Sequence, residues 1–189
     1  MAMHDHERRT ALKAFSALAL TGGASAPAMG ATSPPHLPTP PLSFAFRLHV
    51  LIGAPQEIGM VNGARKRVIP ITGGTVEGPR LTGRVLPGGA DWQTIGPDGT
   101  ADILARYTLE AADGSLISVT NPGFRRGPAP VLAQIAAGQD VDPALYYFRT
   151  TPRFEVAASS AHGWLGNTIF LCAAARHRDH VILDIFEVG

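Results

Sequence analysis

Charged side chains recur in stretches of this sequence that alternate between apolar and polar residues, which is the pattern of β-strands. The guanidinium groups of Arg106 and Arg149 suit two-point recognition of a carboxylate or an enolate oxygen. An acidic side chain buried beside them can have its pKa raised toward neutral pH and then transfer a proton. We therefore take the two arginines as candidate ligand-binding residues, and Glu155, Asp91 and Asp184 as candidate catalytic residues.

The two-residue period of a strand sorts these side chains by face. Arg106 shares a face with Asp102 in one expected strand, and Arg149 shares a face with Glu155 in another. We expect both faces to line an interior cavity, where arginines and acids together form a polar site. The alternative is that the same residues pair on the outer surface as solvated cross-strand partners.

Asp184 interrupts the pattern of the last expected strand, because it shares a face with Ile182, Phe186 and Val188. An isolated buried charge is very costly, so a carboxylate among apolar neighbours must be paired, hydrogen-bonded or protonated. We therefore keep Asp184 as a candidate acid of the lumen.

Two tryptophans and an asparagine complete the expected ligand-binding set. Trp92 and Trp164 stand close to small or polar residues, so each could form a stacking wall for a ligand or cap a barrel end. Packing in the core is the alternative for at least one of them. Asn121, at the end of an expected strand, is the third member of the set.

Composition and spacing exclude several other kinds of site. The formal net charge is +1 and no basic run follows the N-terminal segment, which argues against a nucleic-acid partner. The single cysteine, Cys172, lies in an apolar run and is expected to be a buried, inert thiol. His162, His177 and His180 do not have a recognised metal-ligand spacing, and no glycine pattern opens a nucleotide-binding helix. We therefore expect neither a metal nor a cofactor.

The elements that position these residues are expected to be short strands separated by tight turns. Asp113–Gly114 is a strong hairpin signal, because glycine tolerates positive φ. Residues 130–137 read as one short helix, which could plug a barrel mouth or pack on the outer wall. Many short strands favour a sandwich or a barrel, and about eight strands enclose room for one small ligand. The expected strands are residues 42–52, 65–71, 80–86, 91–95, 100–111, 115–121, 149–157, 168–175 and 180–188.

Four blocks of sequence support the barrel over the sandwich: GGTVEGPRLTGRVLPGGADW at residues 73–92, ARYTL at 105–109, YYFRTTPRFE at 146–155 and GWLGN at 163–167. They resemble the DUF3237 (UPF0311) family of small all-β proteins, and the resemblance extends from about residue 42 to residue 188. It implies an all-β fold, an antiparallel barrel of the calycin or lipocalin type with about eight to nine strands and one short helix. The blocks contain Asp91, Trp92, Arg106, Arg149, Phe154 and Glu155.

One position departs from the family pattern. Many members carry an acidic residue two positions before the arginine of the Arg-Tyr block, whereas this chain has Leu104 there. Asp102 lies on the same face and could replace the missing acidic residue. If it does not, Arg106 has no acidic partner.

The N-terminus predicts export of the protein from the cytoplasm. Arg8, Arg9 and the residues up to Lys13 resemble the twin-arginine export consensus. The apolar run at residues 14–20 is much shorter than the about 20 residues that a bilayer span needs, and is typical of a signal peptide. Small residues follow, and we expect cleavage between Ala28 and Ala31. The alternative is an N-terminal extension with two incidental arginines.

The chain therefore divides into three expected parts. Residues 1–31 are a predicted twin-arginine signal peptide, and residues 32–41 are a proline-rich tether that favours extended geometry. Residues 42–189 form one barrel domain, which is long enough to bury a core.

The leading hypothesis is a periplasmic or secreted barrel that binds a small molecule and catalyses acid–base chemistry without a cofactor. Isomerisation, cyclisation or elimination on a small organic acid or phenolic compound would fit. The alternatives are a non-catalytic carrier and an envelope structural protein. Paired arginines and acids in the lumen favour catalysis, an apolar lumen favours a carrier, and a filled core favours the structural role. The expected partners are the ligand and the twin-arginine export machinery, without nucleic acid or a stable membrane span; the oligomeric state is left open.

Overall fold

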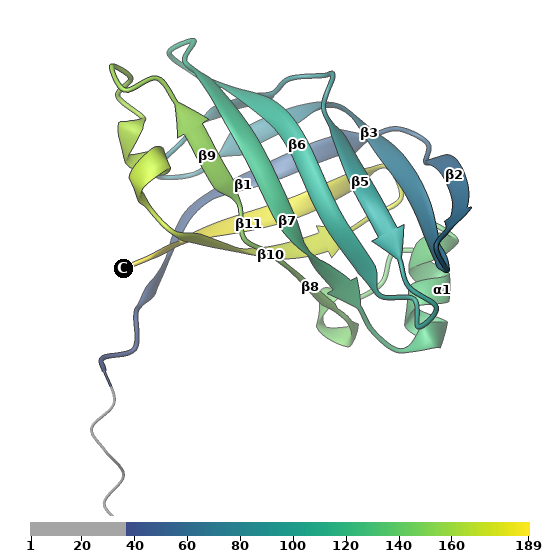
Figure 1. The fold of residues 1–189 in the computed structure, drawn as a ribbon. Helices are drawn as coiled ribbons and strands as arrows, with labels where there is room; N and C mark the ends of the chain where they lie inside the picture. The colour runs from purple at the N-terminus through teal and green to yellow at the C-terminus, as the bar shows by residue number, and fades with distance from the viewer. Residues whose placement is uncertain (1–36) are drawn as a thin grey trace, which may run out of the picture. The chain divides into compact units, whose positions relative to one another are not determined.

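The computed structural model describes residues 37–189, and these residues form a β-barrel with one α-helix (Figure 1). The expected all-β barrel is confirmed, and two of the expected strands have the predicted bounds. The strands are β1 (Leu42–Ile52), β2 (Gln56–Val61), β3 (Ala64–Glu77), β4 (Gly83–Val85), β5 (Ala90–Ile95), β6 (Ala101–Ala111), β7 (Leu116–Arg126), β8 (Tyr147–Thr150), β9 (Arg153–Val156), β10 (Phe170–Arg176) and β11 (His180–Val188).

Eight of these strands close into a ring by antiparallel pairing. The order around the barrel is β6, β5, β3, β1, β11, β10, β8 and β7, and β7 pairs with β6 to complete the circle. The short strand β4 bridges β3 and β6, β2 extends β3 as a hairpin, and β9 pairs with β7. Closure leaves an inner face whose side chains are removed from solvent, as in small ligand-holding barrels.

The long strand β3 changes partners halfway along its length. Residues 65–70 pair with β5, whereas residues 71–77 pair with β1. Gly74 lies in the second part with φ +144°, and a Cβ there would come within 2.0 Å of the His49 carbonyl oxygen. Glycine therefore allows the close approach of β3 and β1 at this point.

Several expected strands differ from the structure in their bounds, and the largest differences are one divided strand and one additional strand. The predicted strand 149–157 is divided into β8 and β9 at Thr151 and Pro152. The reason is that Pro152 has no N–H to donate, while the Thr151 N–H donates to the carbonyl of Pro122 outside the regular ladder, 2.9 Å away. Strand β2 was not expected; its side chains are mostly exposed, so it lacks the apolar face that signals a strand.

The two ends of the barrel are filled differently. At one end, Phe46, Phe154 and Phe170 form edge-to-face contacts with centroids 5.1–5.8 Å apart, and the 3-10 helix Gly163–Asn167 covers them. At the opposite end lies α1 (Ala129–Ala136), which buries Ile135 (Figure 1). The helix is found within one residue of the predicted bounds and lies at the barrel end, beside the turn between β5 and β6.

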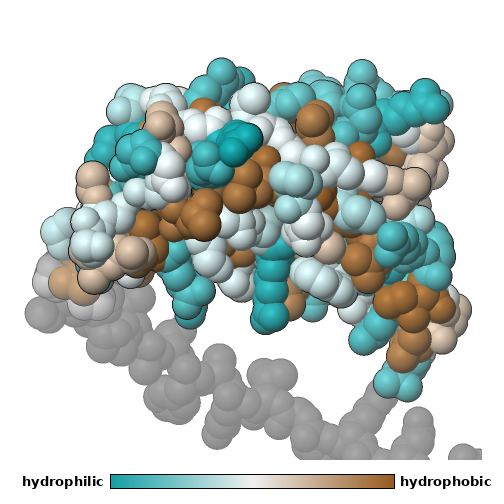
Figure 2. Space-filling model, turned by 90° about the horizontal axis from the view of Figure 1, so that it is seen from above, coloured by the Kyte–Doolittle hydropathy of each residue, from teal (hydrophilic) through white to brown (hydrophobic). Residues whose placement is uncertain are grey.

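The outer wall combines apolar and polar residues. Figure 2 shows hydrophobic residues in brown lying between polar residues in teal on one face of the barrel. Phe124 and Leu171 are among the large apolar side chains that remain exposed.

Candidate functional site in the barrel lumen

Polar side chains gather inside the barrel at the end covered by α1. They come from five of the ring strands and line a small cavity together with apolar residues. The space between them takes a few water molecules or a small ligand group. The polar lining residues are Asp91 and Gln93 of β5, Tyr107 of β6, Asn121 and Arg125 of β7, Thr150 of β8 and Arg176 of β10.

Strand register explains why two of these residues face the same space. Asp91, Ala105 and Asn121 stand opposite one another on the neighbouring strands β5, β6 and β7. Residues in register on adjacent strands point to the same side of a sheet. Because the side chain of Ala105 is small, it leaves room between the two polar side chains.

A chain of hydrogen bonds links Arg67 to Asp91. Arg67 of β3 lies directly opposite Gln93, and its Nε and Nη2 both donate to Gln93 Oε1, at 2.9 and 2.8 Å. Gln93 Nε2 donates in turn to Asp91 Oδ2 at 2.6 Å. Gln93 is 4% exposed, so this chain lies in the barrel interior.

Five buried polar atoms of the cavity residues have no hydrogen-bond partner among residues 37–189. Leaving one such group unpaired costs about 1–3 kcal/mol, and buried polar groups in folded proteins are nearly always paired. Five in one place indicate a site that water or a ligand completes. The atoms are Asp91 Oδ1, Tyr107 Oη, Asn121 Oδ1, Arg125 Nε and Thr150 Oγ1.

The electrostatic balance inside the barrel is positive. The polar residues of the cavity and its edge include one carboxylate, that of Asp91, and three arginines, Arg67, Arg125 and Arg176. Burial and the neighbouring charges of Arg67 and Arg176 lower the pKa of Arg125 to about 10, which still leaves it charged at neutral pH. A cavity with this excess of positive charge favours an anionic ligand.

Burial raises the pKa of Asp91 above its ordinary value. The hydrogen bond from Gln93, the charges of Arg125 and Arg67 and the nearby amide of Leu104 act in the opposite direction without cancelling this effect. Burial also raises the pKa of Tyr107, so its hydroxyl stays protonated and can donate. Asp91 therefore keeps its proton to a higher pH than an exposed aspartate does.

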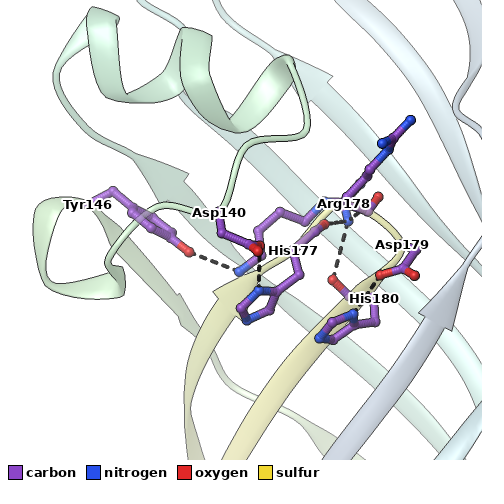
Figure 3. Close-up of polar contacts among 7 residues, drawn as sticks. Asp140, Tyr146, His177, Arg178, Asp179 and His180 are labelled. Atoms are coloured by element: carbon purple, nitrogen blue, oxygen red, sulfur yellow. Dashed lines mark hydrogen bonds and ion pairs between the residues drawn. The ribbon is translucent and has the colours of Figure 1, made fainter.

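The rim of the cavity is held by the turn between β10 and β11 (Figure 3). The hydroxyl of Tyr146 accepts a hydrogen bond from the Arg176 N–H at 2.9 Å, and the Arg176 guanidinium donates to the His177 carbonyl within the turn. His177 and His180 stack with their ring centroids 4.4 Å apart, and Asp140 binds His177 Nδ1 at 2.8 Å. The loop after α1 is thereby attached to the turn that carries Arg176.

Two of the residues predicted from the sequence lie in this cavity, namely Asp91 and Asn121. Three others were placed in the lumen wrongly: Arg106, Arg149 and Glu155 are exposed on the outer wall. The reason is that Ala105 and Tyr107 are the buried neighbours of Arg106, and Phe148 and Phe154 are those of the other two. The charged face of these strands is therefore the outer face. This agrees with the alternative interpretation, in which these residues lie on the outer surface.

The remaining predicted residues also lie outside the cavity. Asp184 is on the outer wall, where Arg47 donates to both of its carboxylate oxygens at 2.6 and 2.8 Å, so its expected pairing is found but its expected place in the lumen is wrong. Trp92 is 45% exposed on the outer wall. Trp164 caps the aromatic end of the barrel, where it packs against Phe170 and under the guanidinium of Arg80.

Sequence reasoning missed all three arginines at the cavity, Arg67, Arg125 and Arg176. Arg125 was overlooked because the expected strand 115–121 ended at Asn121, whereas β7 continues to Arg126. The signal was present: Arg125 is four residues from Asn121 and therefore on the same face of a strand. Arg67 likewise shares a face with buried Ile69.

The cysteine of residues 37–189, Cys172, is buried in β10. Burial raises the pKa of Cys172 to about 12, so its thiol is protonated and unreactive at neutral pH. No group of three or more His, Cys, Asp or Glu side chains in this range is arranged to hold a metal ion. No helix in the same range has the length and apolar character needed to cross a membrane.

Comparison with known proteins places this barrel among relatives. Residues 40–188 match the family described as "Protein of unknown function (DUF3237)". The UPF0311 protein blr7842 of Bradyrhizobium diazoefficiens is 43% identical over 151 residues, which cover 80% of this chain and 98% of that protein. The crystal structure of RPA1785, a conserved protein of unknown function from Rhodopseudomonas palustris, superposes with a TM-score of 0.78 at 38% identity, covering 81% of this chain and all of that one.

A fungal enzyme is a more partial match. The hydroalkoxylation enzyme phnH of Penicillium herquei is 36% identical over 84 residues, which cover 44% of this chain and 56% of that protein.

Proposed function

The chain belongs to the DUF3237 family, and we propose that its barrel binds a small anionic or phenolic compound in the lumen and uses Asp91 to transfer a proton to it. The observation that carries this proposal is the set of five unpaired, buried polar atoms around one cavity. A carrier for apolar molecules would not need them, and a filled structural core would not tolerate them.

The five atoms describe the ligand that would satisfy them. Tyr107, Thr150 and Arg125 supply donors, so the ligand must offer acceptor oxygens. The excess of arginine favours a negative charge on one of these oxygens, such as a carboxylate, an enolate or a phenolate. Asn121 Oδ1 accepts only, so the ligand must also offer a donor such as a hydroxyl group.

Asp91 is the proton donor in this proposal. A protonated carboxyl at the edge of the cavity can deliver its proton to a carbon or oxygen atom of the ligand, and the resulting carboxylate then takes a proton from solvent. The arginines stabilise the negative charge on the ligand oxygen during this exchange. No cofactor enters the step.

The fungal relative supports one form of this chemistry. Hydroalkoxylation adds an O–H bond across a carbon–carbon double bond, which isomerises a molecule when both groups belong to it. In such a cyclisation a phenol loses its proton to solvent on binding, the phenolate oxygen bonds to one alkene carbon, and protonated Asp91 gives its proton to the other. Reprotonation of Asp91 from solvent balances the reaction.

The first experiment measures binding with salicylate, which carries a carboxylate and a phenolic hydroxyl. Charge-assisted hydrogen bonds contribute about 1.5–3 kcal/mol each, so Arg125→Leu should weaken binding about 10- to 100-fold by calorimetry. Arg106→Leu is the matched control, because it removes the same side chain from the outer wall. Equal losses of salicylate affinity in the two variants, or no loss in Arg125→Leu, would contradict a binding site in the lumen.

The second arm measures turnover of 2-allylphenol to its cyclic ether by NMR. We expect wild type to accelerate this isomerisation and Asp91→Asn to return it to the uncatalysed rate. Salicylate binding without any turnover would leave a carrier rather than an enzyme.

Export is a separate part of the proposal. Arg8 and Arg9 lie outside the described residues, so the support is the sequence pattern and the comparison alone. The match to the Bradyrhizobium protein covers 98% of that protein but 80% of this chain, and the family match begins at residue 40. We propose that the segment before the barrel directs it through the twin-arginine machinery to the periplasm or beyond.

A further inference from the structure

The chain of hydrogen bonds from Arg67 to Asp91 has a direction. Nε and Nη2 of Arg67 can only donate, and both donate to the same atom of Gln93, its Oε1. The carbonyl end of the Gln93 amide must therefore face Arg67. Rotating the amide by 180° would turn its N–H groups toward the guanidinium and lose both bonds.

The fixed amide determines what Asp91 can do. With Oε1 toward Arg67, the amide nitrogen faces Asp91 and donates to Oδ2 at 2.6 Å. A proton on Oδ2 would collide with this N–H, so the proton of a neutral Asp91 must be on Oδ1. Oδ1 is buried and has no partner among residues 37–189, and its residue lines the cavity.

We propose that Arg67 is a positioning residue, which acts through Gln93 to confine the transferable proton of Asp91 to Oδ1, the oxygen left for the cavity. The proposal deepens the function proposed above and rests on it for the use of the proton. Arg67 itself need not touch the ligand. Through Gln93, it makes Oδ2 of Asp91 a hydrogen-bond acceptor and leaves the proton of the neutral carboxyl group on Oδ1.

The other groups near Asp91 do not supply this asymmetry. Arg125 and Arg176 are on β7 and β10, and neither donates a hydrogen bond to the carboxylate. The Tyr107 hydroxyl on β6 lies near Asn121 and does not bind the carboxylate, and the Leu104 amide contributes least to favouring the ionised form. These groups favour or disfavour the charge of Asp91, but among the described residues only Gln93 binds one of its oxygens through a side chain.

The test follows the ionisation of Asp91 in the full chain by NMR of ¹³C-labelled aspartate carboxyl groups, assigned with Asp91→Asn. Gln93→Leu removes the N–H that favours the carboxylate, so the midpoint for Asp91 should rise by about one pH unit, a tenfold gain in proton affinity. Gln93→Glu is the second variant: it keeps an acceptor for Arg67 but has no N–H, and it should raise the midpoint as well.

Arg67→Lys separates position from charge. Lysine keeps the positive charge but lacks the fork that holds the amide, so the midpoint for Asp91 should rise by part of the Gln93→Leu effect. In the Gln93→Leu background the same change should add nothing, because Arg67 acts through Gln93. Arg84→Lys, which alters an exposed ion pair with Glu110, is the control and should leave the midpoint unchanged.

Two results would overturn the proposal: an unchanged midpoint in Gln93→Leu and Gln93→Glu, or effects of Arg67→Lys and Gln93→Leu that simply add. A substrate is not needed for this titration, so its outcome is separate from that of the salicylate and 2-allylphenol experiments. Where turnover is found, the alkaline limb of its pH–rate profile should move with the midpoint, which a purely structural role of Arg67 would not cause.

Discussion

Asp91 and Asp184 show how position decides what a carboxyl group can do. Asp184 is fixed by two hydrogen bonds from Arg47 on the outer wall, so both of its oxygens are occupied. Asp91 is buried, has one oxygen bound by Gln93 and keeps the other free. An acid that must exchange a proton needs a free oxygen and a raised pKa, and only Asp91 of this pair has both.

The free energy of unfolding should depend on pH because the pKa of Asp91 is raised in the folded protein. A folded pKa above the unfolded value of about 3.9 means that protonation stabilises the native state, an effect complete below that value and lost as pH rises through the folded pKa. Asp91→Asn cannot ionise, so its free energy of unfolding should improve relative to wild type as pH rises from about 4 toward neutral. Each unit of raised pKa corresponds to about 1.4 kcal/mol.

Urea unfolding of wild type and Asp91→Asn across this pH range measures the difference. Asp102→Asn, an exposed change on β6, is the control and should show no comparable trend. A difference that shrinks with rising pH would mean that the arginines favour the ionised form of Asp91 more than burial disfavours it.

At the level of residues, the alternation of the sequence predicted which side chains share a face of a strand. It did not predict which face points into the barrel. Arg106 and Tyr107 are adjacent, and choosing the charged face as the lumen excluded Tyr107 and placed Arg106 there. A closed barrel buries one face of each strand, so the more apolar face is the inner one by default. The polar residues of a lumen then appear as exceptions within an apolar face, as Asn121 and Arg125 do on the face of β7 that also carries Ile117 and Val119.

At the level of elements, strands with two clear faces were predicted best. Strands β1 and β11 have the expected bounds, because each pairs with two neighbours and buries a regular set of apolar residues. Strand β2 pairs with β3 alone and was missed. The helix α1 was expected, but its place at the mouth depends on contacts with distant segments, such as that between Gly138 and Arg178, which local sequence does not encode.

Replacing Gly74 should disturb the closure of the barrel. In Gly74→Ala the new Cβ would overlap the backbone of β1, which cannot move aside without breaking its pairing with β11. We expect a loss of more than about 4 kcal/mol in the free energy of unfolding by urea denaturation. Gly88→Ala is the matched control, since Gly88 also has positive φ (+104°) but no atom near its Cβ position, and should lose only about 1–2 kcal/mol. Equal losses would assign the effect to φ strain rather than to contact with β1.

On the scale of the whole barrel, the aromatic packing and the polar cavity lie at opposite ends. The aromatic end, with Phe46, Phe154 and Phe170, is closely packed. The end under α1 keeps several buried polar atoms unpaired, which costs stability that the aromatic end offsets. A barrel suits this division because its strands run from one end to the other, so a single fold holds both regions.

Export would be a property of the whole chain, and we propose that Arg8 and Arg9 decide it. Replacing both with lysine keeps the charge but removes the planar guanidinium groups, so recognition of the pair should be lost while the barrel folds as before. In a bacterium with twin-arginine machinery, cell fractionation should find the double variant in the cytoplasm and wild type in the periplasm. The double variant Arg84→Lys with Arg106→Lys makes the same chemical change on the exposed barrel wall and should be exported normally. Undiminished export of the Arg8 and Arg9 variant would assign these arginines to an incidental N-terminal extension.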